Sequence, residues 1–99
     1  MSKLEYEGVV VPVLRYLNAL PRSKAINTHG SVFFERGTPD VLGSISGRMV
    51  AFEAKRDTKE RPRQIQRWRL SQWAAAGAVT GVVTSVEDVK RILAEHGLI

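Results

Sequence analysis

The pattern of apolar and polar positions divides the chain into an N-terminal helical segment, a hairpin, and a second half in which helix and strand alternate. Residues 4–20 place their apolar side chains at helical spacing, which predicts a first helix. Pro12 lies inside this range, and a proline there removes an internal hydrogen bond. We therefore expect a kink or a late start at Pro12, and an end at Pro21.

Residues 40–55 have the pattern of a β-hairpin. Ser46-Gly47 is a two-residue turn between a strand ending at Ile45 and a strand beginning at Arg48. Counting back from the Ile45–Arg48 pair places Asp40 directly opposite Glu53. Weaker strand patterns precede the hairpin at residues 24–27 and 31–34.

The second half begins with a helix predicted over residues 64–76, which follows Pro62 and is stopped by Gly77. Trp68 and Trp73 on this helix are expected to pack in the core. The β-branched run at 78–84 predicts a strand, and Ser85 is a suitable N-cap for a last helix ending near Glu95. The order α-β-β-β-α-β-α predicts an α/β fold with a mixed sheet flanked by helices.

Composition limits the class of protein. With 99 residues we expect one domain over residues 1–99, and the absence of cysteine excludes disulfides and thiolate metal sites. The first residues lack the charged, apolar and small-residue regions that follow one another in a secretory signal. No apolar run approaches the ~20 residues that span a bilayer. We therefore expect a cytoplasmic protein without membrane contact.

The hairpin register places chemistry on one face. Asp40, Glu53 and Lys55 point to the same side, and opposed carboxylates about 4.5–5.5 Å apart repel each other unless a cation lies between them. Hard carboxylate oxygens favour Mg²⁺, with Mn²⁺ as a substitute, and such an ion activates a phosphodiester and a water molecule. Each residue alone also fits an ordinary half-solvated hairpin, but the set in register indicates a metal site.

Charge supplies a second line of evidence. The net charge is +5, and basic residues crowd the segment from Lys55 to Arg69, which is typical of a protein that binds a polyanion. Two alternatives to an enzyme stay open, a non-catalytic nucleic-acid-binding module and a structural or protein-interaction domain. His29, next to Gly30 and near the hairpin, is a candidate metal ligand or phosphate contact, although the interpretation as a polar loop histidine is favoured.

These motifs resemble the VRR-NUC branch of the PD-(D/E)XK nuclease superfamily over nearly the whole chain. The matching features are Gly37-Thr38-Pro39-Asp40, Glu53-Ala54-Lys55, and a glutamine eleven residues before Gly77. That spacing favours Gln66 over Gln64. The family's glutamate in the first helix corresponds to Glu5 or Glu7, and we favour Glu7 because it shares a helix face with Val11 and Leu14.

The resemblance implies a restriction-endonuclease-like fold and a Mg²⁺-dependent endodeoxyribonuclease, acting as a homodimer on branched DNA such as flaps or four-way (Holliday) junctions. It also implies a phage or prophage origin and no organic cofactor. The expected catalytic residues are Asp40, Glu53, Lys55, Gln66 and Glu7. The expected metal ligands are Asp40, Glu53, Glu7 and the backbone carbonyl of Ala54, and the expected DNA-binding residues are Arg36, Arg56, Lys59, Arg61, Arg63 and Arg67.

Overall fold

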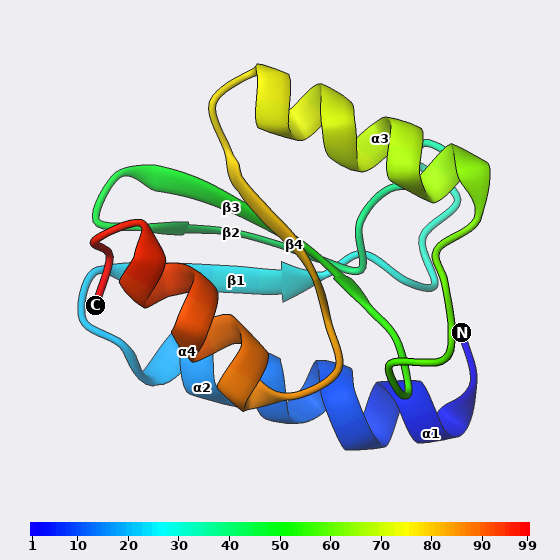
Figure 1. The fold of residues 1–99 in the computed structure, drawn as a ribbon, viewed down its shortest axis with the longest axis horizontal. Helices are drawn as coiled ribbons and strands as arrows, with labels where there is room; N and C mark the ends of the chain where they lie inside the picture. The colour runs from blue at the N-terminus through cyan, green and yellow to red at the C-terminus, as the bar shows by residue number, and fades with distance from the viewer.

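The computed structural model describes residues 1–99 and places a four-stranded sheet between two helical layers (Figure 1). Helices α2 (Val11–Ala19) and α4 (Val86–Glu95) cover one face of the sheet, and α3 (Gln64–Ala75) covers the other (Figure 1). The strand order is β1-β2-β3-β4, with β4 parallel to β3 and the other pairs antiparallel. The predicted order α-β-β-β-α-β-α and the mixed sheet are confirmed. The strands are Ser23–Asn27 (β1), Val41–Ile45 (β2), Arg48–Ala54 (β3) and Val79–Val83 (β4).

The N-terminal helical segment is continuous, and it contains one wider turn. It runs through α1 (Lys3–Glu5), a π-helical turn η1 (Tyr6–Val10) and α2 (Val11–Ala19). The Val11 N–H donates to the Tyr6 carbonyl five residues back, where an α-helix would use the residue four back. A proline ring clashes with the carbonyl four residues before it, so a wider turn just ahead of Pro12 accommodates that ring without a break. The expected kink is replaced by this turn.

The hairpin has the predicted register. Ile45 pairs with Arg48, and the ladder continues to Val41 opposite Phe52, so the next step brings Asp40 opposite Glu53. Both turn residues have positive φ, 49° at Ser46 and 85° at Gly47, as a type I′ turn requires. The turn length therefore fixes which residues meet at the far end of the hairpin.

Strand β3 is buried on both faces. Phe52 is fully buried in the core between the sheet and the helices α2 (Val11–Ala19) and α4 (Val86–Glu95). Glu53, on the opposite face, is only 1% exposed. The half-solvated hairpin that the sequence also allowed is wrong, because α3 (Gln64–Ala75) covers this side of the sheet (Figure 1).

Two further expectations are wrong, and both concern exposed aromatic residues. Residues 31–34 form turns and bends instead of a strand, and Phe33 is 94% exposed. Trp68 is 52% exposed, and no residue of α3 is fully buried. The guanidinium of Arg69 lies 4.7 Å from the centre of the Trp68 ring. No helix in this structure combines the length and the apolarity needed to cross a membrane.

The last elements end and begin where the sequence predicts. Gly77 follows Ala76, the C-cap of α3, and its φ of 105° is a conformation that glycine adopts without strain. Ser85 caps α4, since its hydroxyl accepts a hydrogen bond from the Asp88 N–H at 3.2 Å. The Asp88 carboxylate accepts in turn from the Thr84 N–H at 2.8 Å, which closes the connection between β4 and α4.

Candidate active site

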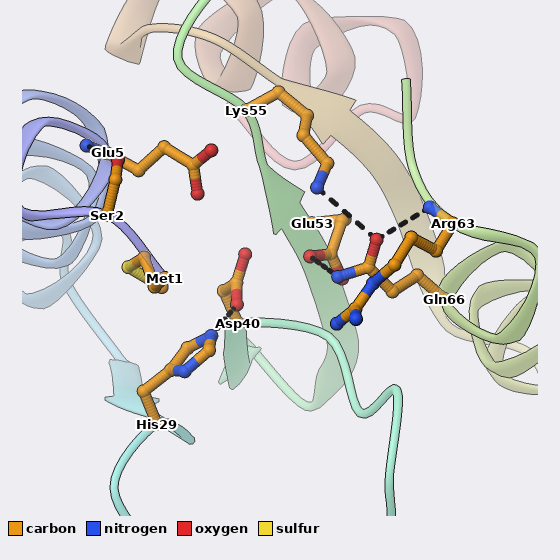
Figure 2. Close-up of a pocket in the computed structure, with 9 residues that line it drawn as sticks. All are labelled: Met1, Ser2, Glu5, His29, Asp40, Glu53, Lys55, Arg63 and Gln66. Atoms are coloured by element: carbon orange, nitrogen blue, oxygen red, sulfur yellow. Dashed lines mark hydrogen bonds and ion pairs between the residues drawn. The ribbon is translucent and has the colours of Figure 1, made fainter. Parts of the chain in front are cut away.

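A polar cleft of about 330 Å³ opens where four segments distant in sequence meet. They are the N-terminal turn, the loop that follows β1, the last residues of β3 with Lys55, and the start of α3 (Figure 2). The side chains from these segments point toward one another across the cleft (Figure 2). The lining residues are Met1, Ser2, Glu5, His29, Asp40, Glu53, Lys55, Arg63 and Gln66.

Asp40 and Glu53 form the buried floor of the cleft, with exposed fractions of 2% and 1%. One oxygen of Asp40, Oδ2, accepts a hydrogen bond from the Ala54 N–H at 2.8 Å, and the other, Oδ1, contacts the His29 ring through Nε2. Oε2 of Glu53 is buried and has no hydrogen-bond donor. Burial, reinforced by the neighbouring Asp40 carboxylate, raises the pKa of Glu53 to about 9. Glu53 therefore keeps its proton at neutral pH while no cation is bound.

Gln66 connects the other polar groups of the cleft (Figure 2). Its Oε1 accepts from Lys55 Nζ at 3.3 Å and from the Arg63 N–H at 2.8 Å, and its Nε2 donates to Glu53 Oε1 at 3.2 Å. The bond to the Arg63 N–H belongs to the N-terminal cap of α3, so the start of the helix fixes the orientation of this amide. Gln64 lies outside the cleft, beside Ile65 and Trp68.

Glu5 lies in the cleft, whereas the favoured Glu7 is exposed and does not line it. Burial, followed by a side-chain hydrogen bond with Glu60, raises the pKa of Glu5. The choice of Glu7 is corrected here, because the buried side of the helix runs through Val9 and Val13, which are 3% and 1% exposed. The π-helical turn over Tyr6–Val10 lies between Glu5 and this buried side, and the lining of the cleft includes Glu5 but not Glu7.

The basic residues are divided between the cleft and its surroundings. Arg63 lines the cleft, and Lys59, Arg61 and Arg67 are exposed and form no ion pair. Arg56 pairs with Glu60 at 3.0 Å, so part of its charge is neutralised within the protein. Arg36 is exposed on the loop before Asp40. The segment from Lys59 to Arg67 therefore presents three unpaired positive charges to solvent in addition to Arg63 at the cleft.

His29, Met1 and Ser2 line the cleft although the sequence does not predict them as site residues. The position of His29 beside Gly30 makes a ligand or phosphate contact possible, but the sequence favours a polar loop histidine. Met1 and Ser2 gave no signal, and Ser2 serves as the N-cap of α1, with its hydroxyl accepting from the Glu5 N–H at 3.1 Å. That cap sets the start of the helical segment that carries Glu5.

The donor set of the cleft suits a hard divalent cation. The structure contains no group of three His, Cys, Asp or Glu side chains spaced to hold a metal ion. Mg²⁺ needs fewer protein ligands than that, since it usually takes one or two carboxylates and fills its remaining positions with water and phosphate. Asp40 and Glu53 supply two carboxylates, and the unpartnered Glu53 Oε2 is an oxygen that a cation would satisfy.

Comparison with known proteins identifies the architecture. No family model matches the chain, and no curated protein matches it. A solved structure described as "VRR_NUC domain protein" superposes with a TM-score of 0.72, covering 100% of this chain and 91% of its own, at 17% sequence identity. The chain has the VRR-NUC fold. The predicted restriction-endonuclease-like sheet is thereby confirmed.

Proposed function

We propose that this protein is a metal-dependent endodeoxyribonuclease that hydrolyses phosphodiester bonds in the cleft. One observation carries most of the argument: Asp40, Glu53, Lys55 and Gln66 converge in a single polar cleft of a VRR-NUC fold. Two adjacent buried carboxylates are costly, because burial disfavours their charged forms and each repels the other. A bound cation would offset that cost.

Asp40 and Glu53 would hold Mg²⁺, with Mn²⁺ as a substitute, and the Ala54 carbonyl is proposed as a further ligand. Glu5 takes the outer carboxylate position expected for Glu7, since Glu5 lines the cleft. When bound, the ion supplies Lewis acidity to the phosphodiester and lowers the pKa of water. The two inner carboxylates are held in place without the ion, Asp40 by the Ala54 N–H and Glu53 by Gln66.

Lys55 and Gln66 act as a pair in this proposal. The Lys55 ammonium either orients the attacking water or stabilises the charge that develops on the phosphoryl oxygens. Gln66 accepts from Lys55 Nζ at 3.3 Å and so directs the ammonium into the cleft. The same amide donates to Glu53, which couples the position of the lysine to that of the carboxylate.

The basic surface would track the DNA backbone. Arg63 lies at the cleft, and contacts to phosphate give affinity with little sequence readout and a steep dependence on salt. We retain branched DNA, flaps or four-way junctions, as the preferred substrate and a homodimer as the active form. The remaining proposed phosphate contacts are Arg36, Arg56, Lys59, Arg61 and Arg67.

The test is cleavage of labelled linear, flap and four-way DNA in Mg²⁺, Mn²⁺ or EDTA. Asp40→Asn keeps the shape of the side chain but weakens a proposed metal ligand, and Glu7→Gln is the matched control outside the cleft. Because the ion contributes several kcal/mol to the transition state, Asp40→Asn should lose roughly 100-fold or more in rate. Cleavage that survives EDTA or Asp40→Asn would refute the metal site. Salt-sensitive binding without any cleavage would favour the non-catalytic binding module.

A further inference from the structure

The loop between β1 and β2 is anchored at the proposed catalytic carboxylate. Thr28, at its start, is 5% exposed. Its N–H donates to the Asp40 carbonyl at 3.0 Å, and its hydroxyl donates to the Pro39 carbonyl at 2.7 Å. These two bonds join the ends of the loop, which is the arrangement of an Ω-loop. The two ends of the loop are therefore held together beside Asp40.

A second set of contacts holds the loop against α3. Arg69 donates through Nε to the Arg36 carbonyl at 3.0 Å and pairs with the Glu35 carboxylate at 3.2 Å. Gly37 lies so close to α3 that an added Cβ would stand 2.7 Å from Ile65 Cγ1. The loop is thus held both at the cleft and against α3, the helix that carries Arg67 and has Arg63 as its N-cap (Figure 1).

The tip of this pinned loop exposes apolar side chains. Val32 is 90% exposed and Phe33 94%, and the Phe33 N–H donates to the Ser31 hydroxyl at 3.2 Å. An aromatic ring this exposed buries almost none of its apolar surface in the free protein, so it gains most from a partner with a flat apolar face. Glu35 beside it is neutralised by Arg69, and Arg36 is exposed, so the surroundings favour an anionic partner. Nucleic acid combines a flat base with an anionic backbone.

The distance along the chain limits which base can be reached. Phe33 is four residues from His29, which lines the cleft, and four extended residues span at most ~14 Å. Successive nucleotides of one strand are about 3.4 Å apart, so the ring reaches roughly four nucleotides from the cut. In paired DNA both faces of a base are covered by its neighbours. A ring at this position therefore finds a free base face only where the strand is unpaired or distorted.

We propose that Phe33, with Val32 beside it, stacks on an unstacked base close to the scissile phosphate and selects DNA with unpaired bases next to the cut. This inference rests on the proposed function and specifies its substrate. Stacking of an aromatic side chain on a base contributes about 1–3 kcal/mol by alanine substitution. That range corresponds to roughly a 5- to 150-fold preference.

The test measures binding in EDTA to two labelled DNAs of the same sequence, one with a single-stranded flap and one fully paired. Phe33→Ala should weaken flap binding roughly 5- to 150-fold and leave duplex binding unchanged. Phe33→Trp, which keeps a stacking surface, should retain the preference. Ile99→Ala, which removes an apolar side chain that is 53% exposed at the other end of the chain, is the matched control. A 2-aminopurine base placed beside the flap junction should change its emission with the wild type and Phe33→Trp, but not with Phe33→Ala.

Two outcomes would overturn the inference. One is an equal loss of affinity for both DNAs, which would make the tip a general contact. The other is that, without DNA, the wild type sediments as a dimer and Phe33→Ala sediments as a monomer. The tip of the loop would then be a contact between subunits. Because binding is measured without metal, a protein that failed to cleave DNA but kept the Phe33-dependent flap preference would refute the nuclease proposal alone.

Discussion

Replacing Glu53 by glutamine should stabilise the metal-free protein while abolishing its response to Mg²⁺. The two side chains have the same shape, and the amide oxygen of the variant accepts from Gln66 Nε2 as Glu53 Oε1 does now at 3.2 Å. The amide nitrogen of the variant takes the position of Glu53 Oε2, which has no hydrogen-bond partner in the wild type. The substitution therefore keeps the contacts and removes only the ionisable group.

The magnitude follows from the pKa of Glu53, which burial raises from 4.5 to about 9 in the folded protein. Between these values the folded state holds a proton that the unfolded state has released, so the wild type loses stability as the pH rises from 4.5 toward 9. Each pH unit in this window is worth about 1.36 kcal/mol. At pH 8 the penalty reaches up to about 5 kcal/mol, and Glu53→Gln escapes it.

The assay is urea unfolding in EDTA between pH 4 and pH 8, with Glu7→Gln as the exposed control. Glu53→Gln should match the wild type near pH 4 and exceed it increasingly toward pH 8, while Glu7→Gln follows the wild type throughout. Mg²⁺ at 100 times its dissociation constant should then stabilise the wild type by about 2.7 kcal/mol and leave Glu53→Gln unchanged. A glutamine variant less stable than the wild type at pH 8, or a difference independent of pH, would refute the burial argument.

Two matched pairs test other parts of the structure. Glu5→Gln should reduce the rate of cleavage and Glu7→Gln should leave it unchanged, because only Glu5 lines the cleft. If both variants cleave DNA at the wild-type rate in a steady-state assay, neither glutamate takes part. Gly43→Ala should destabilise the fold by about 1–3 kcal/mol in urea unfolding, since its Cβ would stand 2.6 Å from the Lys24 carbonyl oxygen, which is backbone. Gly81→Ala should cost less, because its Cβ would meet Ile92 Cδ1, the movable end of a side chain, at 2.5 Å; a larger loss at Gly81 than at Gly43 would contradict this reasoning.

The hairpin shows which part of the site was predictable from the sequence. A two-residue turn at Ser46-Gly47 leaves one way to pair the flanking strands, so every opposed pair follows by counting. The Asp40–Glu53 juxtaposition comes from that count alone. Gln66 was predicted as a site residue from its spacing to Gly77. The N-terminal cap of α3 explains why Gln66, rather than Gln64, faces Glu53.

Burial of the site was not predictable in this way. Glu53 is buried because the chain passes from β3 through α3 to β4, a parallel crossover that lays a helix over that face of the sheet. No local pattern around Glu53 signals the helix above it. The burial of Trp68 was likewise not predictable from the local sequence. Its apolar side chain suggested a place in the core, whereas it is 52% exposed on α3.

Glu7 was favoured over Glu5 for a different reason. The number of residues per turn changes in the part of the first helix that carries the two glutamates. Choosing a face by spacing assumes that each residue advances by the same angle, and the π-helical turn over Tyr6–Val10 breaks that assumption just where the glutamates lie. Pro12 was the visible signal of an irregular helix, but it did not say whether the helix would kink, start late or widen. In the hairpin, the opposed residues follow from counting hydrogen-bonded pairs, so an irregular helix elsewhere does not change them. A face set by helical phase does change, since two residues along a helix point in nearly opposite directions.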